Sequence, residues 1–282
     1  MPTPEQLDRE LSELSLEDQV ATFDEILKHH DFNGMRKIGN FGIAGLDKYT
    51  GGMYEGELIT ISGLTKNGKT LLAQSITRNL IHHDNTVGWF TFEVPPAQFL
   101  ETFRDDPEAM KYGILPIEHR AGNLKWLFTR IAEMHVTWST RVFVIDHLHF
   151  LFDMWSTKNV SLGIGQVVRA LKHLCVVGGF CIMLLCHYSK GQKEENEDSY
   201  ENIRDSSLIA QESDSVFLVR RIKNEDGEYG NEASVSVEFH RRTGEMKRRV
   251  WLSKHGKFLF ESAAPPEQSN GKKKRGGYGY GD

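Results

Sequence analysis

Short apolar runs alternate with longer amphipathic stretches over the middle of the chain. The runs ELITIS, TVGWFTF, RVFVID and FCIMLLC are apolar over most of their length, which is typical of strands buried on both faces of a sheet. Between them, KTLLAQSITRNLIHH and QVVRALKHLCVV carry apolar residues at helical spacing, and a long helical region is expected over residues 96–135. This alternation predicts an α/β fold with a mainly parallel central sheet flanked by helices.

Further strand-forming segments follow one another toward the carboxyl terminus. DSVFLVRR, ASVSVEF and RRVWL are separated by polar turn sequences, and KFLF is expected to form an edge strand. A polar stretch, SKGQKEENEDSYENIRD, lies between FCIMLLC and these strands and is expected to be a loop. The succession predicts an antiparallel C-terminal extension of the sheet.

Three regions of different character are predicted. Residues 1–34 are expected to form a helical N-terminal linker segment, in which one helix covers residues 15–30. The apolar face of that helix could cover the chain's own core or dock on a neighbouring subunit; it consists of Val20, Phe23, Ile26 and Leu27. Residues 35–262 form the folded domain, which opens on a Gly-rich, loop-rich connector. Residues 263–282 are rich in Gly, Lys and Pro without apolar periodicity, which predicts a disordered tail.

The composition excludes several classes of protein. With 282 residues, 26% of them charged, the chain is long enough for a sizeable core, and no apolar run reaches the roughly 18 residues of a membrane span. The acidic N-terminus does not resemble a secretory or transit peptide. The three cysteines lie inside apolar runs and are expected to be buried thiols in a cytoplasmic protein. At a formal charge of −5, nucleic acid binding would need a local basic surface.

The stretch GLTKNGKT directly after ELITIS matches the pattern G-x-x-x-x-G-K-[ST] in full. Its glycines allow backbone N–H groups to approach phosphates, its lysine would reach the β- and γ-phosphates, and its threonine hydroxyl would hold Mg²⁺. The strand before it and the helix after it support this interpretation over a plain strand–turn–helix. The residues predicted to contact nucleotide here are Gly63, Asn67, Gly68, Lys69, Thr70 and Leu71.

Polar residues also follow three other predicted strands. Asp146 ends RVFVID, where a Walker B aspartate would hold Mg²⁺ together with Thr70. Glu93 follows TVGWFTF and could polarise the attacking water. His187 follows FCIMLLC and could touch the γ-phosphate and report its loss to the next loop. Taken singly, each could instead be an ordinary hydrogen-bonded residue at a strand end.

The order of these pieces resembles the RecA-like core of the hexameric replicative DNA helicases: the DnaB type, the helicase half of phage primase-helicases, and Twinkle. GIAGLDKYTGGMYEGELI resembles the segment before the family's phosphate loop, and VGWFTFEVPPAQF its strand–Glu–helix motif. IDHLHFL resembles its Walker B motif, LLCHYSKG its sensor, and IRDSSLIAQESDSVFLVRR its Arg–Gly–Ser…Gln…Asp segment. The resemblance covers residues 35–262 and implies a RecA-like P-loop NTPase that uses ATP and Mg²⁺.

The resemblance also implies a site shared between subunits. In this family an arginine finger from the neighbouring subunit neutralises charge on the transferred phosphoryl group. The segment EFHRRTG places that finger at Arg241 in the register of phage members and at Arg242 in the DnaB register, and the family's lysine is absent. Both could instead be solvated residues at a strand end. Arg221, or less well Arg220, matches a basic residue that touches nucleotide in phage members.

Single-stranded DNA is the second partner that the resemblance implies, gripped in the channel of a ring by the loop after the sensor. The candidate contacts in that loop are Ser189, Lys190, Gly191, Lys193 and Arg204. The same loop holds six carboxylates, which would repel a phosphate backbone, so a solvated charged loop is the alternative. Backbone N–H groups around the serine and glycine could then make the contacts.

These observations predict an ATP-driven replicative helicase from a phage, acting as a hexameric ring on single-stranded DNA with 5′ to 3′ polarity. No primase part is recognised, so a separate primase, polymerase or single-strand-binding protein is a possible partner. One alternative is a RecA-like recombination or annealing ATPase that forms filaments and does not unwind DNA. Another is a regulatory ATPase that docks a protein through the KKKRGGYGYGD tail.

Overall fold

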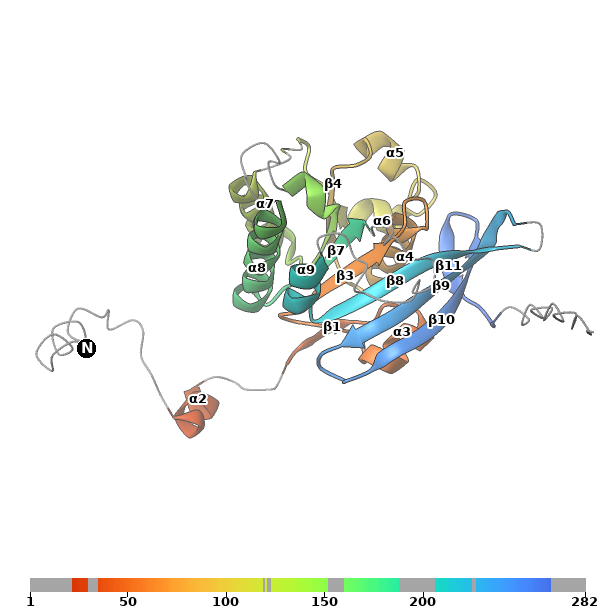
Figure 1. Ribbon diagram of the computed structural model, residues 1–282. Coiled ribbons are helices and arrows are strands. Elements are labelled where there is room, and N and C mark those ends of the chain that lie inside the picture. The colour runs from red at the N-terminus through yellow and green to blue at the C-terminus, as the bar shows by residue number, and fades with distance from the viewer. Residues whose placement is uncertain are drawn as a thin grey trace, which may run out of the picture. The chain divides into compact units, whose positions relative to one another are not determined.

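The computed structural model describes residues 22–29, 35–118, 120, 123–151, 160–187, 206–224 and 227–264. The chain divides into two units, residues 1–36 and 37–282 (Figure 1). In the first unit, α2 (Phe23–His29) begins with a reciprocal cap: Thr22 N donates to Glu25 Oε2 (2.8 Å), and Glu25 N donates to Thr22 Oγ1 (3.3 Å). The helix predicted over 15–30 is thus confirmed for these seven residues, and its first part lies outside the described residues.

The second unit is built on a sheet of nine strands among the described residues. In spatial order these are β11 (Phe258–Glu261), β10 (Met246–His255), β9 (Tyr229–His240), β8 (Ser215–Lys223), β3 (Leu58–Gly63), β7 (Cys181–His187), β6 (Val142–Asp146), β4 (Val87–Thr91) and β5 (Gly113–Ile114). The strands from β8 to β5 pair in parallel, and β8 to β11 pair antiparallel. The predicted fold class, including the antiparallel extension and its edge strand, is confirmed.

Helices cover both faces of this sheet, because each parallel strand presents apolar residues alternately to either side. One face packs against α3 (Ala44–Thr50), α4 (Lys69–Ile81), α5 (Pro96–Leu100) and α6 (Pro107–Tyr112). The other packs against α7 (Leu124–Trp138), α8 (Val160–Gly178) and α9 (Ser206–Glu212), which lie together at the left of Figure 1. The three cysteines are free and buried, as predicted, and burial raises the pKa of each thiol.

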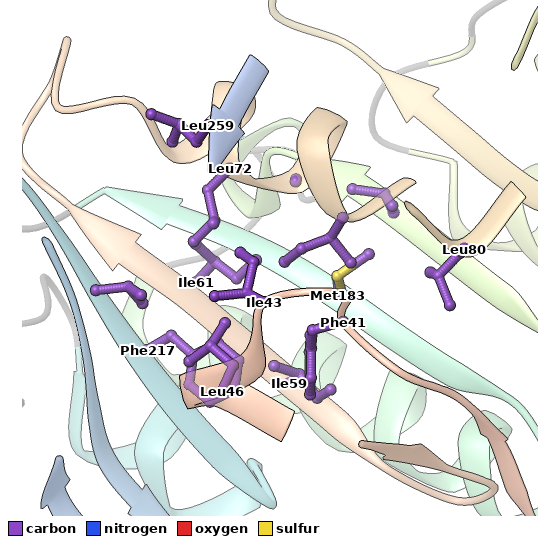
Figure 2. Close-up of a cluster of buried hydrophobic side chains, with 14 of the residues drawn as sticks. Phe41, Ile43, Leu46, Ile59, Ile61, Leu72, Leu80, Met183, Phe217 and Leu259 are labelled. Carbon is purple, nitrogen blue, oxygen red and sulfur yellow. The ribbon is translucent and has the colours of Figure 1, made fainter. Parts of the chain in front are cut away.

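The Gly-rich connector is more ordered than the predicted loop-rich entry. It contains β1 (Lys37–Gly39), α3 and β2 (Met53–Tyr54), where β1 and β2 form a small antiparallel sheet. Asp47 fixes the entry to α3, since its two carboxylate oxygens accept from Phe41 N (2.7 Å) and Gly42 N (3.0 Å). Figure 2 shows Phe41, Ile43 and Leu46 packed beside β3, so the connector closes part of the core. The turn-forming residues of the connector indicated loops, but they did not indicate that its apolar residues are buried in the core.

The long helical region expected over residues 96–135 is divided into three helices and includes a short strand that was not expected. The region holds α5, α6, the short edge strand β5 and α7, because two side chains cap new helices within it. Asp106 Oδ1 accepts from Ala109 N (3.1 Å) ahead of Pro107, and Asn123 Oδ1 accepts from Trp126 N (2.8 Å). The helix α9 was also missed, since it is short and follows the polar stretch. Among the described residues, no helix is long and apolar enough to cross a membrane.

Gly88 lies in β4, beside Phe143 of β6 and Met134 of α7. A Cβ atom there would stand 2.7 Å from Phe143 Cδ1 and 2.8 Å from Met134 Sδ. We therefore expect Gly88→Ala to lower the free energy of unfolding by about 1–3 kcal/mol through overpacking. Urea unfolding followed by circular dichroism measures this. Gly230→Ala in β9, whose added Cβ meets nothing closer than 4.0 Å, is the matched control and should stay within about 0.5 kcal/mol of wild type.

Candidate nucleotide-binding and hydrolysis site

The loop between β3 and α4 has a backbone that only glycine permits at its two ends. A Cβ on Gly63 would stand 2.5 Å from Val219 O on the neighbouring strand. Gly68 has φ 91°, a left-handed conformation that costs L-residues energy, and nothing lies within 4 Å of its Cβ position. The loop therefore leaves open space beside the amino end of α4, where exposed N–H groups favour an anion. Asn67 is buried in this loop, and the partly buried side chain of Leu71 packs against the core.

Lys69 folds its side chain back across the loop. Its Nζ donates to Gly63 O (3.0 Å) and Leu64 O (3.2 Å), and the residue is only 6% exposed. Burial lowers the pKa of the Lys69 ammonium, while the carboxylates of Asp146 and Glu93 oppose that shift. A cation held by carbonyl oxygens alone is poorly compensated, so phosphate oxygens would be better partners.

Thr70 and Asp146 lie together as the sequence predicted. Thr70 Oγ1 donates to Asp146 Oδ2 (2.7 Å), and Asp146 is 1% exposed. The other carboxylate oxygen, Oδ1, has no hydrogen-bond partner among the described residues. Burial, with Glu93 nearby, raises the pKa of Asp146 to about 6, whereas the Thr70 hydrogen bond and Lys69 act in the opposite direction. A buried carboxylate oxygen without a partner beside a hydroxyl fits a hard divalent cation such as Mg²⁺.

The ends of β4, β6 and β7 bring the other predicted residues together. Thr91, Asp146 and Leu185 form one row across these three strands, and Glu93 and His187 follow that row by two residues. His187 also pairs in register with Gly63, so the sensor position adjoins the start of the phosphate loop. The predicted loop, Walker B, glutamate and sensor positions therefore share one edge of the sheet.

His147 is a member of this site that the sequence reasoning missed. Its Nδ1 lies 3.1 Å from Glu93 Oε2, and the side chain is 8% exposed. Burial, followed by the neighbouring imidazoles of His187 and His149 and by Lys69, lowers the pKa of His147 to about 3, so the ring is neutral at pH 7. Because a carboxylate oxygen accepts hydrogen bonds, we assign Nδ1–H of His147 as the donor and Glu93 Oε2 as the acceptor in this contact. The Asp–His pair within IDHLHFL was the available signal.

The predicted arginines lie in two different environments at the opposite edge of the sheet. Arg242 Nε donates to buried Glu57 Oε1 (2.9 Å), its Nη2 donates to Thr50 O (2.6 Å), and its guanidinium stacks 3.6 Å from the ring centroid of Tyr54. Arg241 is 54% exposed and donates through Nη2 to Gln211 O (2.7 Å). Arg242 is thus held within its own chain. Arg241 is more exposed, although its Nη1 also lies 3.5 Å from Asp214 Oδ1.

Two further predictions concern binding residues. Arg221 lies toward the phosphate-loop edge of β8, where its Nη2 donates to Tyr229 O (3.0 Å) and Gly230 O (2.9 Å). It is therefore on the predicted side of the sheet but already engaged with β9. The DNA-binding candidates lie outside the described residues: Ser189, Lys190, Gly191, Lys193 and Arg204.

Comparison with known proteins bears on this arrangement. The family model of the DnaB-like helicase C terminal domain matches residues 40–104 and 108–259. A structure described as a DnaB-like replicative helicase and its interactions with primase matches with a TM-score of 0.68 at 18% identity, covering 91% of this chain and 70% of that one. A second structure, described as an ATPase domain, matches with a TM-score of 0.71 at 18% identity, covering 87% of this chain and 100% of that one. Among curated protein sequences, none matches.

The raised pKa of Asp146 predicts a pH-dependent stability. The carboxyl binds its proton more tightly in the folded state, so its contribution to stability is full below about pH 4 and is lost as the pH rises through about 6. Without magnesium and nucleotide, Asp146→Asn should therefore raise the free energy of unfolding at pH 7.5, on the order of 3 kcal/mol for a shift of about two pKa units.

Thermal unfolding at pH 7.5 and pH 5 checks this expectation. The gain in Tm of Asp146→Asn should be several degrees at pH 7.5 and clearly smaller at pH 5. Exposed Glu228→Gln is the matched carboxyl-to-amide control and should show no gain at either pH. An equal gain at both pH values, or none, would contradict the assignment.

Proposed function

The chain belongs to the DnaB-like helicase C-terminal domain family, and from this membership we propose that it is an ATP-driven motor that moves along single-stranded DNA as a hexameric ring. The observation that carries the proposal is the meeting of the phosphate loop, the Thr70–Asp146 pair and Glu93 at one edge of the sheet. Movement from 5′ to 3′, action in replication and a phage origin are parts of the same proposal.

The residues of this edge divide the chemistry among them. Backbone N–H groups from Gly63 to Thr70 and the Lys69 ammonium bind the phosphates of ATP. Thr70 Oγ1 and Asp146 would hold Mg²⁺, which would supply positive charge beside the phosphates. Glu93 accepts a hydrogen bond from the attacking water and takes its proton. His147 orients Glu93 through the 3.1 Å contact, and His187 couples departure of phosphate to the loop that begins after it.

Arg241 supports a site completed by a second copy of the chain. Arg241 N donates to Asp214 O (2.7 Å), immediately before β8, and therefore lies beside the amino end of β3. The phosphate loop begins at the carboxyl end of the same strand, four residues after Ile59, which pairs with Ser215. Strand residues rise about 3.3 Å each, so on the order of 13 Å separates the two edges. We propose that Arg241 reaches the phosphates of the neighbouring subunit as the arginine finger.

DNA and protein partners complete the proposal. The loop over residues 189–205 is the proposed DNA contact within the ring. Its candidate residues are those named from the sequence. One structure similar to this chain is described as a replicative helicase that interacts with primase. A separate primase is accordingly a proposed partner, with a polymerase or a single-strand-binding protein as further ones.

The first test is hydrolysis and unwinding by the full chain. Wild type should hydrolyse ATP faster when single-stranded DNA is present and should separate a forked DNA substrate. Lys69→Ala removes the cation on the phosphates, and we expect at least a 100-fold loss of DNA-stimulated hydrolysis in a steady-state phosphate-release assay. Lys254→Ala, an exposed lysine of β10, is the control and should keep wild-type rates.

Negative-stain imaging with ATP analogue and DNA accompanies these assays. Closed six-fold rings together with strand separation are the expected result. Helical filaments without strand separation would instead identify a filament-forming DNA-binding ATPase. Hydrolysis that survives in Lys69→Ala would reject the phosphate-loop assignment altogether.

The two adjacent arginines allow a paired test of the shared site. Arg241→Ala should abolish hydrolysis with less than about 1 kcal/mol loss of stability, because the side chain is largely exposed. Arg242→Ala leaves buried Glu57 without its charged partner and should lower the free energy of unfolding by about 3 kcal/mol. Urea unfolding and phosphate release, measured on both variants, separate the two roles.

Mixing inactive variants tests whether the finger acts across subunits. In a one-to-one mixture of Lys69→Ala and Arg241→Ala chains, about one interface in four joins an intact lysine to an intact arginine. Partial recovery of hydrolysis in the mixture is expected. A mixture as inactive as either variant, in rings shown to exchange subunits, would place the arginine outside the site.

A further inference from the structure

Glu93, His147 and His187 form a cluster that the proposed hydrolysis chemistry does not fully explain. Each offers one ligand atom, and these three atoms lie within 4.8 Å of one another. The residues come from the ends of β4, β6 and β7, and β6 lies between the other two strands. Magnesium at Thr70 and Asp146 would use only oxygen ligands and needs no imidazole. Besides their proposed roles in hydrolysis, two imidazoles beside a carboxylate offer a ligand set with a different metal preference.

We propose that Glu93, His147 and His187 bind a zinc-class divalent cation, and that this ion withdraws Glu93 from the attacking water. Two imidazoles and one carboxylate are the protein ligands of many zinc sites that keep a fourth position open. The 3.1 Å between His147 Nδ1 and Glu93 Oε2 is close to the separation of two ligands on one such ion. The inhibition through Glu93 rests on the proposed function, whereas the binding of the ion does not.

The surroundings of the cluster favour an ion that enters from solvent. Glu93 is 42% exposed, His147 is 8% exposed, and His187 is partly buried. The imidazole of His147 is thus fixed by packing while the carboxylate can move toward an incoming ion. The ring centroid of His147 lies 4.2 Å from that of His187, so the two imidazoles are close enough to bind the same ion. Ion binding would replace the hydrogen bond from His147 Nδ1–H to Glu93: the ring proton would shift to Nε2, and Nδ1 would become the ligand atom without net release of a proton.

Selectivity separates this site from the magnesium site beside it. Nitrogen ligands raise affinity for Zn²⁺, Co²⁺ and Ni²⁺ far above that for Mg²⁺. The Thr70–Asp146 pair has the opposite preference, because it offers a hydroxyl and a carboxylate. The two sites should therefore fill independently, and excess magnesium should not displace an ion from the histidines.

Binding is measured on the full-length, untagged chain without nucleotide. Cobalt is the probe, because four-coordinate cobalt has an intense visible absorption that six-coordinate cobalt lacks. We expect one Co²⁺ per chain, an absorption that survives a large excess of Mg²⁺, and bleaching by one equivalent of Zn²⁺. No four-coordinate cobalt spectrum, or displacement by Mg²⁺, would overturn the proposal.

Variants identify the ligands. His187→Gln keeps a polar side chain of similar length and should weaken Co²⁺ binding at least 10-fold, as should Glu93→Gln. Asp146→Asn, which alters the magnesium site, and His255→Gln, an exposed histidine of β10, should leave cobalt affinity unchanged. His149, whose ring lies 5.3 Å from that of His147, is the remaining nearby candidate. Loss of binding in His149→Gln with retention in His187→Gln would overturn the assigned ligand set.

The functional part is tested separately. At saturating Mg²⁺ and ATP, zinc at its measured dissociation constant should halve the DNA-stimulated hydrolysis of wild type, and a chelator should restore it. Zinc that binds without slowing hydrolysis would remove the inhibitory role. Absence of hydrolysis even without zinc would count against the proposed function, whereas cobalt binding is measured regardless of that outcome.

Discussion

The parallel pairing of β3, β7, β6 and β4 is the constraint on which the site depends. Carboxyl ends of adjacent parallel strands emerge about 4.8 Å apart at one edge, so residues distant in sequence become neighbours there. The register places His187 beside Gly63 and Thr91 beside Asp146. A slip of one residue between β3 and β7 or between β7 and β6 would turn Asp146 away from Thr70. Close packing of the buried side chains on both faces favours this register.

Both edges of the sheet bury charge, with different consequences. At the amino edge, Glu57 is matched by Arg242, and Asp214 is matched by Lys172 Nζ (2.7 Å) and Leu58 N (2.8 Å). Burial raises the pKa of Glu57, and the Arg242 hydrogen bond opposes the shift. At the carboxyl edge, Asp146 Oδ1 lacks a hydrogen-bond partner among the residues that the structure describes. The amino edge is thus a satisfied structural network, while the carboxyl edge is poised to gain from ligands.

This contrast explains how two neighbouring arginines can differ in role. Arg242 is drawn inward by Glu57 and Tyr54, and it ties the β9–β10 turn to the connector. The residue before it, Arg241, donates through its backbone N to Asp214 O, and its side chain is 54% exposed and lies 3.5 Å from the Asp214 carboxylate. Sequence spacing permits either arginine as the finger. The greater exposure of Arg241, 54% against 23% for Arg242, supports the proposal that Arg241 is the finger.

Local sequence determined the strands, the phosphate loop and the sheet class. A continuous apolar run favours a buried strand, and glycine is required at particular loop positions, so both features can be read from a short segment. GLTKNGKT, Asp146, Glu93 and His187 were identifiable for that reason. The division of residues 96–135 by Asp106 and Asn123 depends on caps that compete with helix propensity, and the burial of Phe41 depends on distant β3. Only the tertiary structure decided that His147 contacts Glu93 and that Arg242 pairs with Glu57. Contacts between side chains from different strands depend on register, which no single segment encodes.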